Sequence, residues 1–273
     1  MQELSVKELQ QVSLEILLDI HRFCEEHKLR YSLAYGSLIG AIRHKGFIPW
    51  DDDVDIVMPR PDFEFFCKNF KSENNAMIYY GNERSAIACF ARVSDMVNTV
   101  FVTDSPWTSR VSGVWIDIFP LDGVEDEQSE YAKRYSILKN KCSFVYKFRR
   151  QNHHITPKDK PWPIIRTWLN KIIGLNGLIP AGIINEIVRS SKKINYDKAN
   201  YLGQITCFDD GPIQFCKDDF SSYIDVDFEG YKLKAMAGYD HHLKQLYGDY
   251  LNLPPEEERV PKQYWIHFYW RNK

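Results

Sequence analysis

The 273-residue chain lacks several patterns that assign proteins to common classes. Its six cysteines form no Cys-x-x-Cys pair, which argues against a zinc knuckle and against a dithiol redox motif. No apolar run is long enough to span a membrane. The first residues, MQELSVKELQ, do not show the charged-then-apolar pattern of a secretory signal. We therefore expect a cytoplasmic protein with reduced, partly buried thiols.

A charge excess of either sign is also missing. The chain has 35 Lys and Arg against 37 Asp and Glu, a formal net charge of −2, so no basic surplus indicates a nucleic-acid partner. Hydrophobic residues make up 44% and charged residues 26%, as in ordinary soluble proteins. The length allows one large domain or two small ones. The function must therefore be read from local motifs.

Four carboxylates stand within residues 51–55, where the sequence reads DDDVD. The apolar residues Val54, Ile56 and Val57 predict a buried strand, whose alternation would point Asp53 and Asp55 to the same face. Carboxylates this close repel one another unless a cation compensates. Mg²⁺ is commonly held by one or two carboxylates together with substrate phosphates. The pattern predicts a divalent metal site, and a solvated acidic turn is the alternative.

A glycine-serine pair precedes these acids by about sixteen residues. Residues 31–35 predict a short strand, Gly36 and Ser37 a tight turn, and residues 38–42 the start of a helix. The first amides of a helix are donors to phosphate. A basic patch of Arg43, His44 and Lys45 follows. An anion-binding turn beside a cation site indicates a nucleotide diphosphate bound through its metal ion.

One further aspartate lies in the apolar run of residues 114–123. Asp117 is flanked by Ile116 and Ile118, and a carboxylate in such surroundings is costly to bury unless it is paired or coordinated. The alternative is a structural aspartate that accepts hydrogen bonds from backbone amides. Asp122 and Gly123 are predicted to form a turn.

These stretches resemble the LicD family of phosphocholine transferases, which is related to the fukutin-type sugar-phosphate transferases. The resemblance covers residues 35–44 (YGSLIGAIRH) and 46–55 (GFIPWDDDVD), and it extends to the IDIFPLD run at 116–122. A Tyr-Gly-Asp at 247–249 followed by Pro254-Pro255 is similar to the family's closing motif. The resemblance implies an α+β fold, in which a nucleotidyltransferase-like mixed sheet is flanked by helices. In that fold a neighbouring strand supplies a third carboxylate, and Asp117 matches it.

The resemblance also implies a reaction. CDP-choline would be the donor, CMP the leaving group, and the acceptor a sugar hydroxyl on a lipid-linked cell-surface glycan precursor of the teichoic acid or lipopolysaccharide type. Asp53, Asp55 and Asp117 are the expected catalytic residues and ligands of one or two Mg²⁺ (or Mn²⁺) ions. The residues expected to bind substrate are Gly36, Ser37, Arg43, His44, Lys45, Trp50, Asp51 and Asp52. A quaternary ammonium suits an aromatic box, for which Trp50, Trp107 and Trp115 are candidates.

Three other functions stay open from the residues. A nucleotidylyltransferase would use the same acids to attack an NTP and release pyrophosphate. A related enzyme would transfer another alcohol phosphate, such as ribitol or glycerol phosphate, from its CDP donor. A non-catalytic metal- or nucleotide-binding protein that assembles glycan enzymes is the third alternative, although all three carboxylates are present.

The rest of the chain predicts the elements around this site. Residues 5–27 predict a helix with a capping box of Ser5 and Glu8. Further helices are expected after Pro61 and over residues 127–150, 164–173, 181–194 and 239–247, and strands over 86–93, 99–103, 201–208 and the hairpin 224–235. Prolines at 157, 161 and 163 mark a boundary. We expect a catalytic core over 1–156, an added helical subdomain over 157–200 that shapes the acceptor side, and a C-terminal part over 201–273 packed on the core.

The predicted helix over residues 127–150 has an uneven charge distribution. Residues 131–150 contain seven Lys and Arg and no acid. Such a helix can contact the anionic inner face of a membrane or attract a phosphate-bearing acceptor. A solvated basic face is the alternative.

Overall fold

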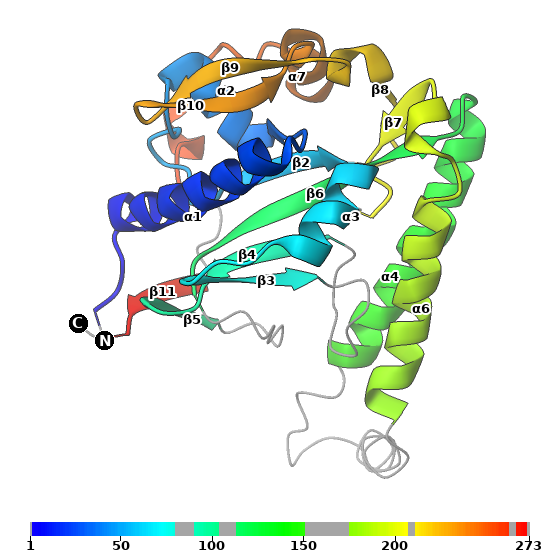
Figure 1. The fold of residues 1–273 in the computed structure, drawn as a ribbon, viewed down its shortest axis with the longest axis horizontal. Coiled ribbons are helices and arrows are strands. Elements are labelled where there is room, and N and C mark those ends of the chain that lie inside the picture. Colours follow the sequence, from blue (N-terminus) through cyan, green and yellow to red (C-terminus); the bar gives the residue numbers. More distant parts are fainter. Residues whose placement is uncertain are drawn as a thin grey trace.

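The computed structural model describes residues 2–79, 90–103, 113–150, 175–206, 211–261 and 266–271. Within these residues a seven-stranded mixed sheet is the centre of an α+β fold, with helices on one face and at one end (Figure 1). Its main path runs β1 (Ser32–Leu33), β2 (Asp55–Pro59), β6 (Trp115–Val124), β4 (Ala91–Asp95) and β3 (Asn75–Tyr79). At its far end β6 also pairs with β7 (Tyr201–Gly203), which pairs with β8 (Phe215–Cys216). β2 and β6 are parallel, and Asp55, the first residue of β2, pairs with Asp117, the third residue of β6.

The helix α1 (Val6–His27) covers one face of this sheet. It has the predicted capping box, in which the Ser5 hydroxyl accepts from the Glu8 amide and the Glu8 carboxylate accepts from the Ser5 amide. The expected apolar stripe is buried, with Ile16 and Ile20 almost inaccessible to solvent. α3 (Arg60–Asn69) lies on the same face, because Phe23 of α1 and Phe66 of α3 meet edge to face at 5.5 Å. The prediction of a helix after Pro61 is confirmed.

Strand alternation divides the central residues between this covered face and the opposite one. Ile56 of β2 pairs in register with Ile118 of β6, and both are fully buried under the helices. Asp55 and Asp117 form the neighbouring register pair and therefore point to the opposite face. The face under α1 and α3 thus carries Ile56 and Ile118, and the opposite face carries Asp55 and Asp117.

The remaining elements surround the sheet. At one end α4 (Gln128–Arg150) packs against α6 (Leu175–Ser191) (Figure 1). Beyond β1 lies a second layer, the hairpin β9 (Tyr223–Phe228) and β10 (Tyr231–Met236), with α2 (Tyr35–His44) and α7 (Tyr239–Tyr247). The predicted hairpin is confirmed, and its turn residues Glu229 and Gly230 both have positive φ. The predicted helix 239–247 is also confirmed.

A C-terminal strand was not predicted. β11 (Ile266–Trp270) pairs antiparallel with β5 (Thr99–Thr103), the strand expected over 99–103. The amide of Leu4 donates to the carbonyl of Phe268 at 2.8 Å, so the N-terminal residues join this pair. The two ends of the chain therefore lie close together (Figure 1).

Several predicted boundaries were wrong. Gly36 and Ser37 are not a turn, because α2 begins at Tyr35, whose φ of 48° makes the change of direction itself. Asp122 and Gly123 are not a turn either but lie in β6, where Asp122 is buried in an ion pair with Arg60, 2.7 Å between Nε and Oδ1. An ion pair between distant segments thus overrode a local turn signal.

Three other predictions changed in extent. β4 continues through Ser94 and Asp95 before the chain turns, because the Asp95 carboxylate accepts from the amides of residues 97 and 98. α6 begins six residues before the expected 181 and contains Pro180 in its second turn. β7 ends at Gly203, well before residue 208. The predicted helix 164–173, the boundary prolines, Trp107 and residues 86–89 lie outside the described residues.

Within the described ranges, no helix combines the length and the apolar character needed to cross a bilayer. The four cysteines in those ranges are free thiols, and Cys24 and Cys142 are buried. Burial raises the pKa of the Cys24 thiol, which keeps it protonated.

Candidate active site

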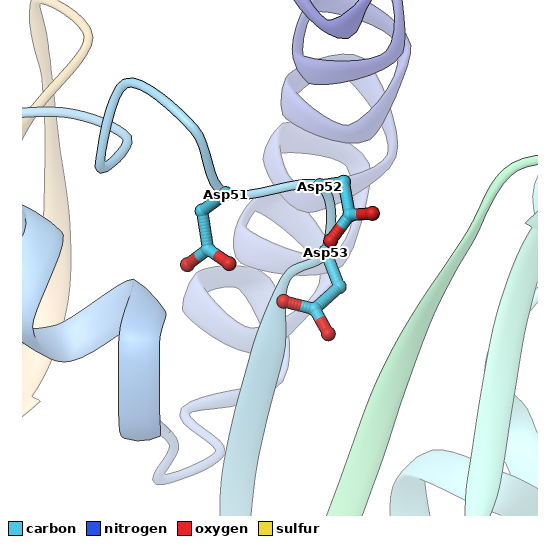
Figure 2. A group of neighbouring side chains, drawn as sticks. All are labelled: Asp51, Asp52 and Asp53. Atoms are coloured by element: carbon cyan, nitrogen blue, oxygen red, sulfur yellow. The ribbon is translucent and has the colours of Figure 1, made fainter. Parts of the chain in front are cut away.

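A loop that leads into β2 carries the first three predicted acids. Oxygen atoms of Asp51, Asp52 and Asp53 lie within 4.8 Å of one another (Figure 2). The strand itself begins only at Asp55, two residues after Asp53, so the strand alternation expected for Asp53 and Asp55 does not orient Asp53. The loop places Asp53 beside the start of the strand instead. Carboxylate oxygens are the ligands that hard divalent cations prefer.

The parallel pairing of β2 with β6 brings the third predicted acid to the same place. Asp55 and Asp117 are direct register partners, so their side chains are neighbours on the face opposite α1 and α3. Burial raises the pKa of Asp55 well above its usual value, and the charges of Asp53, Asp117 and Asp51 raise it further. The acids of this cluster therefore lie close enough to repel one another.

Arg92 is the partial counterion, and the sequence reasoning missed it. β4 pairs antiparallel with β6, which sets Arg92 opposite Asp117. The guanidinium donates through Nε to Asp117 Oδ1 and through Nη2 to Oδ2, the second bond at 3.1 Å. It also lies 4.5 Å from the ring centroid of Trp115. Asp117 is therefore held by a side chain, whereas the structural alternative had expected backbone amides. An arginine on a predicted strand was visible in the sequence, but its partner depended on the strand register.

Gly36 and Ser37 shape the acidic loop from the first turn of α2. A Cβ atom on Gly36 would lie 2.5 Å from Asp51 Oδ2, so the glycine makes room for this carboxylate. The buried Ser37 hydroxyl accepts a hydrogen bond from the amide of Asp55 at 3.0 Å and fixes the start of β2. These contacts explain why the two motifs occur together in the sequence. Direct binding of phosphate by this turn of helix stays a prediction.

The basic patch at the end of α2 is tied to the C-terminal tail. Arg43 Nη1 donates to the carbonyls of Tyr250 at 2.9 Å and Asn252 at 3.0 Å, and its Nε contacts His44 Nε2 at 2.9 Å. Burial lowers the pKa of His44, and the neighbouring Arg43 lowers it further. Lys45 caps the helix in the left-handed conformation and is exposed. The residues after Tyr-Gly-Asp thus hold Arg43 in place, a role that residue chemistry had not suggested.

The tryptophans proposed for a choline box already contact guanidinium groups. Arg259 lies 5.7 Å from the Trp50 ring centroid, and Arg92 lies over Trp115, of which 8% is exposed. Trp107 lies outside the described part of the chain.

A polar cavity of about 430 Å³ lies elsewhere, between α1 and the start of β3. Asn75 and Asp19 on its wall are joined by a hydrogen bond of 3.2 Å. No predicted site residue lines it. The cavity is therefore separate from the acidic cluster.

The fold and the site together define a class: an α+β protein whose carboxylates meet at the adjacent starts of two parallel strands, beside a helix that ends in basic residues. Comparison with known proteins gives the family. Residues 28–160 match the family model described as "LicD/FKTN/FKRP, nucleotidyltransferase domain". The chain is 33% identical, over 96% of its length and 97% of the relative's, to the lipopolysaccharide cholinephosphotransferase LicD of Haemophilus influenzae. It belongs to the LicD family.

Shorter similarities were also found. An uncharacterized protein of Rickettsia typhi is 36% identical over 60 residues, which cover 21% of this chain and 19% of that protein. An uncharacterized protein of Rickettsia prowazekii is 38% identical over 48 residues, 18% of each chain. Neither relative adds information on activity.

Proposed function

We propose that the chain, a phosphotransferase of the LicD family, transfers phosphocholine from CDP-choline to a sugar hydroxyl of a cell-surface glycan precursor and releases CMP. The acceptor would be lipid-linked and of the teichoic acid or lipopolysaccharide type. Similarity to a lipopolysaccharide cholinephosphotransferase over nearly the whole chain supports the transferred group. The observation that carries the proposal is the register pairing of Asp55 with Asp117 beside Asp53. We also infer that the sheet is of the nucleotidyltransferase-like type, in keeping with the matched family model.

The side chains present fit a divalent cation. Asp53, Asp55 and Asp117 would hold Mg²⁺ or Mn²⁺, with Asp51 and Asp52 near enough to contribute oxygen atoms. An all-carboxylate donor set suits such hard ions, and the crowding of the acids is what a bound cation would relieve. The chemistry that such an ion supplies is neutralisation of the donor's diphosphate.

Side chains of the protein would position the donor and the acceptor and would stabilise the charges that develop during transfer. Phosphoryl transfer forms a bond from the acceptor oxygen to phosphorus and breaks the bond from phosphorus to the CMP oxygen, and it needs little covalent help. Asp117 or Asp51 would take the proton of the acceptor hydroxyl. Arg43, His44 or Lys45 would stabilise the departing CMP, and Gly36 and Ser37 would contact phosphate oxygens.

The acceptor side is proposed to involve the helical region. We keep the division into a core over 1–156, a helical addition over 157–200 and a C-terminal part over 201–273. α4 would approach the inner face of the membrane, although two of its basic residues are engaged within the protein. Arg134 pairs with Glu125 at 2.9 Å, and Lys141 pairs with Glu186 of α6. The other basic side chains of α4 would make the membrane contact, and the protein would act on the cytoplasmic side.

The test is to incubate the protein and Mg²⁺ with a lipid-linked glycan precursor and one donor at a time: CDP-choline, CDP-ribitol, CDP-glycerol or an NTP. We expect CMP and a phosphocholine-bearing glycan from CDP-choline alone. Pyrophosphate from an NTP, or turnover of another CDP-alcohol, would replace the proposal with one of the alternatives.

Variants at the acids test the metal site separately. Asp55→Asn should abolish transfer and weaken Mg²⁺ binding, measured by calorimetry without any substrate. Asp218→Asn, at an exposed position, is the matched control and should change neither. If Asp55→Asn bound Mg²⁺ as the unmodified protein does, the proposed ligand set would be wrong.

A further inference from the structure

Three aromatic rings lie together on the face of the sheet opposite α1 and α3, directly beyond the acids. The ring of Phe119 meets the ring of Tyr35 edge to face, with centroids 5.8 Å apart and an interplanar angle of 89°. It meets Phe90 on its other side, with centroids 4.7 Å apart. Tyr35 and Phe90 are partly exposed. We call Tyr35, Phe90 and Phe119 the aromatic group.

The strand geometry fixes the position of this group relative to the acids. Phe119 follows Asp117 by two residues on β6, so both point to the same face, about 6.6 Å apart along the strand. Val57 of β2 is the register partner of Phe119, just as Asp55 is the partner of Asp117. The aromatic group therefore begins two residues further along the strands than the carboxylates of Asp55 and Asp117.

Tyr35 has a backbone conformation that is rare for a bulky residue, at the position where its ring meets Phe119. Its φ of 48° is in the left-handed region, which a bulky residue rarely adopts, and only Ala34 separates the residue from β1. The hydroxyl donates to Gln204 Oε1, which fixes the ring from the β7 side. Backbone strain of this kind persists where the surrounding structure imposes it, and it is concentrated at functional sites.

The chemistry of this face favours a cation. Aromatic rings attract cations to their faces, and a quaternary ammonium is the ligand that such groups commonly bind. The Arg92 guanidinium lies 5.6 Å from the centroid of one ring of this group, that of Phe90. Its charge is paired with Asp117, and the carboxyl groups of Asp55 and Asp53 lie close to that pair.

We propose that the aromatic group binds the trimethylammonium end of the donor's choline, a site that rests on the proposed function. When the phosphorus atom lies at the register pair of Asp55 and Asp117, the two-carbon linker of choline runs along the strand direction. The trimethylammonium end then reaches Phe119 of the aromatic group. The group then sets the choice of alcohol: it favours a quaternary ammonium over a primary ammonium, and over the uncharged ends of ribitol or glycerol.

The test compares affinities for CDP-choline, CDP-ethanolamine and CDP, measured by calorimetry in the presence of Mg²⁺. The unmodified protein should bind CDP-choline about tenfold more tightly than CDP-ethanolamine. Phe90→Leu should lose most of this preference while its affinity for CDP stays the same. Tyr35→Phe, which keeps the ring and removes the hydroxyl, should retain a preference. Phe47→Leu is the matched control, because Phe47 is also partly exposed and contacts one ring, Phe228, at 4.9 Å.

The outcomes separate this inference from the proposed function. If the unmodified protein prefers CDP-choline and Phe90→Leu keeps the full preference, the aromatic group is not the choline site and the function stands. If the unmodified protein binds CDP-choline no better than CDP, the donor assignment fails and the site fails with it. Phe119→Leu, at a more buried position, should act in the same direction. If that variant did not fold, Phe90→Leu would still decide the question.

Discussion

Two glycines of α2 give the sharpest test of how the acidic loop is built. Gly36 and Gly40 lie on the same helix, one turn apart, and both are replaced by alanine. At Gly36 the new methyl group would lie 2.5 Å from Asp51 Oδ2, the end of a side chain. At Gly40 it would lie 2.5 Å from the carbonyl oxygen of Gly46 and 3.3 Å from the amide of Ile48, both backbone atoms. The two substitutions should therefore have opposite consequences.

The expected change in the free energy of unfolding depends on which atoms the new methyl group displaces. In Gly36→Ala the Asp51 carboxylate can rotate away, and alanine in a helix gains up to about 1 kcal/mol over glycine. The free energy of unfolding should stay the same or rise slightly, while the displaced Asp51 weakens Mg²⁺ binding and transfer. In Gly40→Ala the loop backbone cannot yield easily, and overpacking costs about 1–3 kcal/mol. That variant should lose stability, and its Mg²⁺ affinity should change less than that of Gly36→Ala.

The assay pairs urea denaturation with calorimetric Mg²⁺ titration on each variant. The midpoint and slope of the urea transition give the free energy of unfolding, and the titration gives the affinity of the site. The reasoning would be refuted if Gly36→Ala lost stability as Gly40→Ala does, or if it bound Mg²⁺ as tightly as the unmodified protein. Either result would mean that the close approach of Gly36 to Asp51 does not position the carboxylate.

Two further predictions concern buried ionisable groups. Arg60→Met should lower the free energy of unfolding by about 3–5 kcal/mol, because it leaves Asp122 buried without its cation. The double variant Arg60→Met/Asp122→Leu should recover most of this loss. Urea denaturation measures both free energies. His242 is 3% exposed and burial lowers its pKa to about 4. In the unfolded chain the histidine is protonated below about pH 6.5, whereas in the folded chain it stays neutral down to about pH 4. The free energy of unfolding should therefore fall by about 3 kcal/mol as the pH drops from 6.5 to 4. In His242→Phe the free energy of unfolding should depend less steeply on pH.

The double variant and the pH series each have a result that would count against them. If Arg60→Met/Asp122→Leu were no more stable than Arg60→Met, the loss would come from packing and not from an uncompensated charge. If His242→Phe and the unmodified protein lost stability in parallel between pH 6.5 and 4, other groups would account for the acid sensitivity.

Local signals in the sequence predicted much of the fold. The capping box of Ser5 and Glu8 and the apolar stripe of α1 specify a helix without reference to the rest of the chain. The Glu-Gly turn specifies the β9–β10 hairpin in the same way. Where such local signals failed, a contact with a distant segment set the structure. Asp122 precedes a glycine, as in many turns, but its ion pair with Arg60 of α3 holds it within β6.

The sequence alone determined which residues supply charge to the candidate site: the acids of 51–55, the isolated Asp117 and the basic end of α2. Only the tertiary structure decided their neighbours. The parallel register of β2 and β6 sets Asp55 against Asp117, and the antiparallel register of β4 brings in Arg92. The physical reason is that alternation within one strand tells which side chains share a face, whereas contacts across strands depend on register and strand order, which the whole packed chain sets.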